Sequence, residues 1–437
     1  MAAKRFVWWW LTAVVGLLTL TALANFSVDP YGIYGWINIA GLNQDKTQAV
    51  DQSRMAKVYL VDHARPATLL IGSSRVEAGL DPESPAWPQD LRPVFNLGIP
   101  GSDPYTQLRY LQDALATTRP KLVVIGTDFI ESLTSSANLA AASHIRGSLD
   151  FEERLRVTAS GAPNGGLRLA RARDIASTLL SLSALGDSIS TLLSQRDVTS
   201  RKLTALGFNT AANYQGLVQT EGEYSLFVAK DREKIAEIIP LPKHPQLDVG
   251  PIGQSIAEAL AHGSRVIVVI TPGHADELEI YRQAGIMHLY DAWLRRLTET
   301  VAAAGDGKVE LWNFAGLTPY TVEKIPNQGD THTQLSWFWE TNHFKPALGN
   351  LIISRILGQG PEGFGEQLTL TTLPRVQAEL RAQQQQYVET HPAGVTRISQ
   401  LLAERMDHVC QPDPALCPRT VADANQRSID TQPHQDQ

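Results

Sequence analysis

The sequence has only two cysteines, Cys410 and Cys417, near the end of its 437 residues. They exclude a disulfide framework and a cysteine-rich metal site, and they can close at most one small loop. Basic residues form no block, and 38 Lys and Arg against 45 Asp and Glu leave a net charge of −7. A nucleic acid partner is therefore not expected. With 43% hydrophobic residues, most of the chain should fold around a substantial core.

One long apolar run is present. Residues 6–25 carry no charge and follow Lys4 and Arg5. This length favours an uncleaved transmembrane anchor over a signal peptide, although Ala22-Leu23-Ala24 resembles a cleavage site and keeps a cleaved signal peptide as the alternative. Because basic residues stay in the cytoplasm, we expect a single-pass protein of a bacterial inner membrane with its C-terminal part in the periplasm.

Five short runs of β-branched and aliphatic residues predict strands, at 67–74, 93–101, 121–128, 264–272 and 308–314. They are continuously apolar, which is typical of buried parallel strands. Helical patterns separate them. One follows Ser102 or Asp103 with Pro104 in its first turn, and others cover about 251–261, 275–304 and 346–357. The alternation predicts an α/β fold with a parallel central sheet.

The chain divides into four predicted regions. These are a cytoplasmic stub and anchor at 1–26, a juxtamembrane segment at 27–60, an α/β domain at 61–357, and a C-terminal region at 358–437 that is polar and helical and then disordered. Strand patterns fade between about 132 and 250, where amphipathic helical stretches predominate. This segment is therefore expected to be a helical insertion that covers the site.

Residues that carry acyl-transfer chemistry follow the predicted strands. Ligands bind beyond the carboxyl ends of parallel strands, so these positions should meet at one edge of the sheet. Gly72-Ser73-Ser74 follows the first strand, Gly101 the second and Asp128 the third, while Glu340-Thr341-Asn342-His343 follows the fifth. A hydroxyl, backbone amides beside glycines, and a carboxylate three residues before a histidine are the parts of such a site.

These motifs resemble the SGNH, or GDSL-like, hydrolase superfamily, in particular its membrane-anchored bacterial branch of alginate acetylation and teichoic acid D-alanylation proteins. The resemblance covers about 60–131 and 260–357. It implies a flavodoxin-like three-layer sandwich in which Ser74 is the nucleophile, His343 the base and Glu340 its orienting carboxylate. It also implies an oxyanion hole formed by the amides of Ser74 and Gly101 and by the residue at position 128.

Two residues depart from the family pattern. Asp128 stands where the family commonly has an Asn donor, and an ionised carboxylate there would repel an oxyanion. It must then be protonated, or turned toward Arg75 or backbone amides, or the third donor is absent. Glu340 replaces the usual Asp and is one methylene longer, which the loop must accommodate.

Three further residues are candidates for substrate binding: Arg75, His274 and Trp339. His274 follows the fourth strand and could line the pocket, or it could begin the next helix. Trp339, in the cluster 337–339, could stack on a sugar or pack in the core. The nearby pair Asp330 and His332 most simply belongs to a polar loop.

The sequence thus predicts a serine acyltransferase or esterase that acts on acyl groups, most simply acetyl, of a cell-surface polysaccharide. Neither a metal nor an organic cofactor is required by this chemistry. For a transferase, the resemblance implies a multi-pass membrane O-acyltransferase as partner, which passes the acyl group outward. The alternative is a non-catalytic binding or scaffold protein with the same fold, for which Asp128 is the main argument.

Overall fold

The computed structural model describes residues 2–35, 38–135, 149–239, 245–305 and 307–410. Cys417 and the end of the chain that was expected to be disordered lie outside these residues, and so does the possible loop between Cys410 and Cys417.

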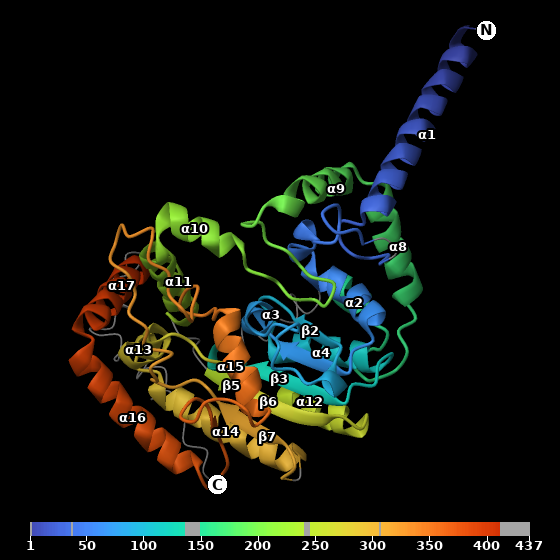
Figure 1. Cartoon of the computed structure of the whole chain (residues 1–437). Coiled ribbons are helices and arrows are strands. Elements are labelled where there is room, and N and C mark those ends of the chain that lie inside the picture. Colours follow the sequence, from blue (N-terminus) through green and yellow to red (C-terminus); the bar gives the residue numbers. More distant parts are fainter. Residues whose placement is uncertain (1, 36–37, 136–148, 240–244, 306, 411–437) are drawn as a thin grey trace.

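A six-stranded sheet forms the centre of the fold, in the order β2-β1-β3-β6-β7-β8 (Figure 1). Its strands are β1 (Thr68–Gly72), β2 (Val94–Gly98), β3 (Leu122–Thr127), β6 (Arg265–Ile270), β7 (Glu310–Asn313) and β8 (Glu366–Gln367). The first five in spatial order are parallel, and β8 is antiparallel to β7. The α/β class and the five predicted strands are confirmed. The order of the parallel strands is that of doubly wound sheets of the flavodoxin type.

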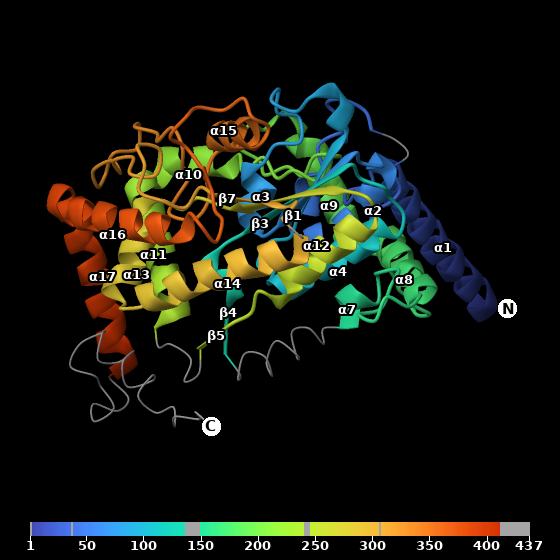
Figure 2. The same ribbon diagram turned by 90° about the horizontal axis from the view of Figure 1, so that it is seen from below.

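Successive side chains along each strand pack into two different cores. Leu69 and Ile71 of β1 face a core formed with α2 (Ser53–Ala64), α4 (Pro104–Leu115), α12 (Gly250–Ala261) and α14 (Met287–Gly305). Leu70 faces the other core, formed with α3 (Ser74–Gly79) and α15 (Pro346–Ile356). Figure 2 shows α4, α12 and α14 along one face of the sheet and α15 on the other. Helices therefore cover both faces, which explains why the strands are continuously apolar.

Helix ends follow the sequence signals with one exception. Asp103 caps α4, because its carboxylate accepts the Thr106 amide at 2.8 Å. The prediction of a single helix over 275–304 is wrong, because the structure has two helices there, α13 (Ala275–Gln283) and α14. Gly285 adopts φ +73° between them and ends the first helix.

The insertion at 132–250 is mainly helical, as expected. Its described elements are α7 (Leu149–Glu152), α8 (Leu167–Leu180), α9 (Leu182–Leu193), η3 (Ser194–Arg196), α10 (Asn213–Glu221) and α11 (Glu223–Ile238). It is bounded by β4 (Leu133–Ser135) and β5 (Pro245–Leu247), which pair antiparallel and bring its two ends together. The remaining short elements are η1 (Thr47–Val50), η2 (Gln89–Leu91) and α5 (Phe129–Ser132).

The α/β domain continues beyond the predicted boundary at 357. Strand β8 completes the sheet, and α16 (Leu373–Thr390) and α17 (Pro392–Cys410) follow it. Leu380 and Leu401 from these helices enter the same core as α14. The Gln-rich composition concealed this packing, because most polar residues of the two helices are exposed, although Gln377 and Gln384 are buried.

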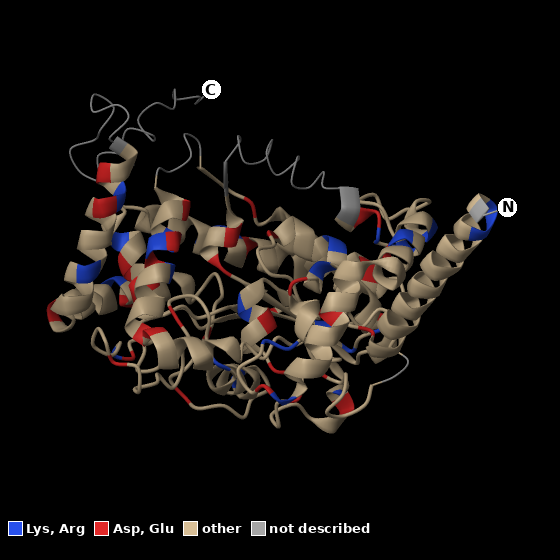
Figure 3. Cartoon of the chain, turned by 90° about the horizontal axis from the view of Figure 1, so that it is seen from above, with Lys and Arg blue, Asp and Glu red and all other residues tan. Residues whose placement is uncertain are grey.

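Helix α1 (Ala2–Val28) projects from the domain, and its segment Ala3–Val28 is long and apolar enough to cross a membrane (Figure 1). Figure 3 shows Lys and Arg on this helix only at its N-terminal end, whereas charges of both signs are interspersed over the domain. After α1, the side chains of Tyr31 and Met55 pack with Ala184 of the insertion. The juxtamembrane segment is thus folded against α9.

Candidate active site

The turn from β1 to α3 holds Ser74 at the carboxyl edge of the sheet, between β2 and β3. Gly72 is required by close packing, since a Cβ there would lie 2.4 Å from Cγ2 of Val76 and 2.9 Å from the carbonyl oxygen of Gly126. The Asn96 side chain of β2 donates hydrogen bonds to the carbonyls of Val76 (2.7 Å) and Leu80 (2.8 Å). These contacts hold the C-terminal part of α3 and so anchor the short helix that begins at Ser74 to β2.

A tight loop presents Glu340 and His343. Phe338 and Phe344 pair as an antiparallel bridge, and the Trp339 amide donates to the His343 carbonyl at 2.9 Å. Within the loop, the Glu340 carboxylate accepts the amides of Asn342 (2.8 Å) and His343 (3.2 Å). The extra methylene of Glu340 relative to Asp is therefore accommodated by a loop that folds around its carboxylate.

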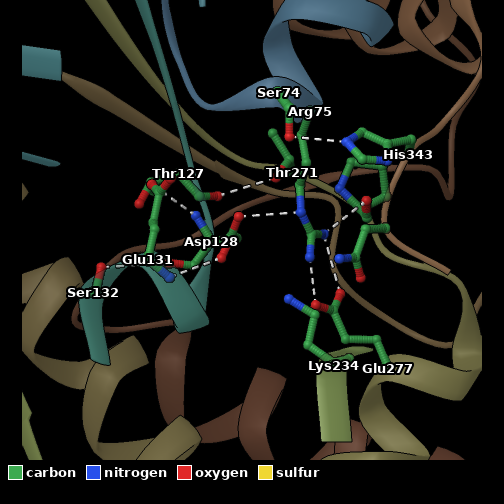
Figure 4. Close-up of polar contacts among 12 residues, drawn as sticks. Ser74, Arg75, Thr127, Asp128, Glu131, Ser132, Lys234, Thr271, Glu277 and His343 are labelled. Carbon is green, nitrogen blue, oxygen red and sulfur yellow. Dashed lines mark hydrogen bonds and ion pairs between the residues drawn. The ribbon is translucent and has the colours of Figure 1, made fainter. Parts of the chain in front are cut away.

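The structure brings Ser74, His343 and Glu340 into one chain of hydrogen bonds. The Ser74 hydroxyl lies 2.8 Å from Nε2 of His343, although the two residues are 269 positions apart. Nδ1 of His343 is hydrogen-bonded to Oε1 of Glu340. In Figure 4 the Ser74 hydroxyl and the His343 ring point toward each other. This is the arrangement of a nucleophile, a base and an orienting carboxylate.

Glu340 is 1% exposed, and its environment favours the charged form. Burial alone would raise its pKa, but the His343 ring and the loop amides hold the pKa of Glu340 at about 2. An ionised carboxylate at this position fixes the proton of the imidazole on Nδ1 and leaves Nε2 as the acceptor for the Ser74 hydroxyl.

Asp128 is turned toward Arg75 and a backbone amide, which is one of the three alternatives expected for it, and it does not take the third place in the oxyanion hole. Its carboxylate lies 3.1 Å from Nε of Arg75 and accepts the Glu131 amide at 3.1 Å. The Glu131 carboxylate in turn accepts the Asp128 amide at 3.1 Å, which completes a capping box at the start of α5. Asp128 therefore orders a helix start and an ion pair, and it offers no donor to an oxyanion.

Arg75 is also not a substrate-binding residue, because it is 3% exposed. Its guanidinium forms an ion pair with Glu277 as well as with Asp128, and it donates to the Pro272 carbonyl at 3.3 Å. Burial alone would lower the pKa of Arg75, but the carboxylates of Glu277 and Asp128 raise it above its ordinary value. Figure 4 shows Arg75 extending between these two carboxylates, away from His343.

His274 does not line the candidate site either. It is 2% exposed and caps α13, where Nδ1 accepts the Asp276 amide at 3.2 Å. Its Nε2 is 2.8 Å from the Glu323 carbonyl. The alternative interpretation, that His274 begins the following helix, is therefore correct.

Trp339, a predicted substrate-binding residue, is not among the residues that line the cleft and lies behind Tyr214. It is 7% exposed, and its indole stacks on the Tyr214 ring with centroids 5.5 Å apart. The Tyr214 hydroxyl lies 3.4 Å from Oε1 of Glu340 and 3.5 Å from Nδ1 of His343. Tyr214 was not identified from the sequence, because it comes from the insertion and belongs to no recognisable motif.

Ser74 and His343 open into a cleft of about 550 Å³. Its walls come from the segment before α2, from the β2–α4 loop and from the insertion, with the lining residues Arg54, Pro100, Arg154, Arg201, Asn209 and Tyr214. The insertion contributes Arg154, Arg201, Asn209 and Tyr214 to the walls of the cleft. The lining combines charged and amide side chains with apolar ones such as Val50, Met55 and Ala78.

Gly101 lies beside this cleft, next to Pro100. Its backbone has φ +60°, and the Arg54 guanidinium lies 3.3 Å from its carbonyl oxygen. Within the described part of the chain, the backbone amides of Gly101 and Ser74 donate no hydrogen bond. Both amides are consistent with the predicted oxyanion role.

A buried network supports the loop from behind. The Thr341 hydroxyl donates to Asp231 of α11 at 2.5 Å, and Asp231 lies 3.7 Å from the guanidinium of Arg397 in α17. Burial and the nearby Asp276 raise the pKa of Asp231 well above its ordinary value. The C-terminal helix thus contributes to the position of the loop that carries Glu340.

Two other sequence features lie away from this site. The Asp330 carboxylate accepts the amides of His332 and Thr333, both at 2.9 Å, in an exposed polar turn, as expected. Among the residues that the structure describes, no group of three or more His, Cys, Asp and Glu side chains is placed to hold a metal ion.

Comparisons of this chain with protein families, with curated proteins and with solved structures found no match.

Proposed function

We propose that this protein is a membrane-anchored serine acyltransferase or esterase of the SGNH type, acting on O-acyl groups of a cell-surface polysaccharide on the periplasmic side of a bacterial inner membrane. The observation that carries the proposal is the 2.8 Å contact between the Ser74 hydroxyl and Nε2 of His343, with Glu340 on the other ring nitrogen. By accepting the histidine N–H together with two loop amides, Glu340 holds the His343 ring toward Ser74.

The chemistry follows from these positions. Nε2 of His343 takes the Ser74 proton as the oxygen attacks the ester carbonyl, and the carbonyl electron pair moves to the oxygen. The backbone amides of Ser74 and Gly101 stabilise this oxyanion. When the tetrahedral species collapses, the leaving group of the acyl donor, which is the sugar oxygen in an esterase, departs with the proton from His343. An acceptor hydroxyl or water then attacks the acyl-Ser74 ester by the reverse sequence.

The polar side chains of the cleft could bind a sugar. Arg54, Arg201 and Asn209 offer donors to sugar hydroxyls, and the Tyr214 ring offers an aromatic surface. Helix α1 would hold this cleft near the membrane. A transferase would then receive its acyl group from a multi-pass membrane O-acyltransferase.

The test compares Ser74→Ala with the matched variant Ser73→Ala, whose side chain makes no capping hydrogen bond. Turnover of an aryl acetate and of an acetylated oligosaccharide should fall by at least about 10³-fold in Ser74→Ala. It should change little in Ser73→Ala. Equal turnover in the wild type and Ser74→Ala would favour the scaffold function instead.

A further inference from the structure

Helices α8 and α9 both pack against α1, and the chain bends by 68° where α8 ends and α9 begins. The side chain of Asn25, which is fully buried, fixes this bend. Its Nδ2 donates to the carbonyls of Thr178 (2.9 Å) and Ser181 (3.2 Å), and its Oδ1 accepts the Ser188 hydroxyl at 2.9 Å. Asn25 follows the apolar run of α1, so the bend lies where that helix would leave a membrane.

The polarity of α8 and α9 is the reverse of that of a water-soluble helix. The inward side chains are small or polar and include Asp174, Thr178, Ser188 and Thr191, which are at most 4% exposed. On α9 and the end of α8 several outward ones are large and apolar, whereas the first half of α8 also exposes Arg168 and Arg173. The outer face of α8–α9 consists of Leu180, Leu182, Ile189 and Leu193, which are 50%, 66%, 51% and 78% exposed. In water a helix at the protein surface turns its apolar side inward, so this face is built for an apolar neighbour.

Neither helix can cross a bilayer. Helix α8 has 14 residues and α9 has 12, which correspond to about 21 and 18 Å at 1.5 Å per residue. The hydrocarbon core is about 30 Å thick. Figure 1 shows α9 lying across the end of α1 along the top of the domain. This placement fits a helix that lies in a membrane surface.

We propose that the outer face of α8–α9 inserts into the lipid surface of the membrane that α1 is suited to cross. The face continues the exposed apolar surface of α1, where Leu20 and Leu23 are 67% and 58% exposed. Between 179 and 195 the only charged residue is Asp187, and its carboxylate accepts the Tyr31 hydroxyl at 2.5 Å. An apolar face without a charged member, continuous with a helix suited to cross a membrane, fits acyl chains better than a protein partner.

This contact would also position the cleft. Helix α9 packs on η1, whose Val50 lines the cleft together with Asp51. When α9 lies in the membrane surface, it fixes the distance between the membrane and the cleft wall that contains Val50. Helix α1 alone would allow the domain to tilt relative to the membrane. The proposal does not depend on which reaction the cleft performs.

The test places an environment-sensitive nitrobenzoxadiazole label on the full chain in phosphatidylcholine–phosphatidylglycerol vesicles. Cys410 and Cys417 are replaced by Ser, and the label is attached at Ile189→Cys or, as a control, at the exposed Gln385→Cys of α16. We expect blue-shifted emission at position 189 and stronger quenching by lipids spin-labelled near the headgroup than near the chain end. The control should be quenched by aqueous iodide only.

Three results would overturn the proposal. The first is emission and iodide quenching at position 189 equal to those at position 385, which would show that the face lies in water. The second is stronger quenching of the label at position 189 by lipids spin-labelled near the end of the acyl chain than by those labelled near the headgroup, which would indicate a spanning segment. A blue shift without lipid quenching would indicate a protein partner or a second copy. As a further check, Leu182→Glu with Leu193→Glu should return the label at 189 to water without loss of helix content, because both side chains are exposed.

Discussion

Replacing Asp128 by Asn tests whether this residue stabilises the fold or takes part in catalysis. In the structure its carboxylate pairs with Arg75 at 3.1 Å and caps α5. Asn caps a helix about as well as Asp, so the capping contact should persist. What the substitution removes is the negative charge beside Arg75, which keeps its other partner, Glu277.

The magnitude follows from this geometry. Two unit charges 3.1 Å apart attract by on the order of 5 kcal/mol at an effective dielectric constant of about 20. Desolvation and the remaining Arg75–Glu277 pair offset much of this energy. A hydrogen bond to a charged group contributes about 1.5–3 kcal/mol, so we expect a loss of about 1–3 kcal/mol in the free energy of unfolding. Each kcal/mol should lower Tm by about 2–4 °C.

The assay combines urea denaturation with acetyl-ester turnover. Asp81→Asn is the matched control, because its carboxylate accepts the Glu83 amide at 2.8 Å but forms no ion pair with a described residue. Asp128→Asn should be less stable than this control and should keep its turnover, since Asp128 contacts neither Ser74 nor His343. Unchanged stability together with abolished turnover would refute the reasoning and would make Asp128 a catalytic group.

Two further predictions concern groups beside the site. Burial raises the pKa of Glu131 to about 8, above its ordinary value of 4.5, so its contribution to stability is present below pH 4.5 and is lost as the pH rises toward 8. Glu131→Gln should therefore reduce the fall in Tm between pH 5 and pH 8, and an unchanged fall would contradict this assignment. Tyr214→Phe removes the hydroxyl near Glu340 and keeps the ring, so turnover should fall by about 2- to 10-fold without loss of stability. A loss of more than about 10³-fold would instead give the Tyr214 hydroxyl a direct catalytic role.

The five parallel strands could be predicted from the sequence because both of their faces are covered by helices. Continuous runs such as 122–127 leave little choice of secondary structure, and the turn residues that follow them mark the functional edge. Ser74 was found because it follows such a strand, whereas His343, which lies well beyond β7 in the loop before α15, was assigned its role through the resemblance to the SGNH pattern. Edge strand β8 was missed because its two residues, Glu366 and Gln367, pair only with β7 and carry no apolar signal.

The misassigned residues depend on partners that are distant in sequence. Arg75 is held by Glu277, 202 positions away, and nothing near Arg75 reveals that its charge is neutralised in the interior. His274 and Trp339 are buried by the insertion and the loop before α15, so strand-end placement alone could not show which way they face. The break at Gly285 was hidden because Ala284 and Ile286 continue the apolar pattern.

Labelling by a fluorophosphonate probe tests the central claim most directly, because the probe reacts only with a serine that a base has activated. The account predicts that the full-length protein is labelled once, that the modified peptide carries the adduct on Ser74 and not on Ser73, and that His343→Ala abolishes labelling while the fold persists. Absence of labelling in the folded protein, or labelling that survives His343→Ala, would contradict a mechanism based on the Ser74–His343 contact.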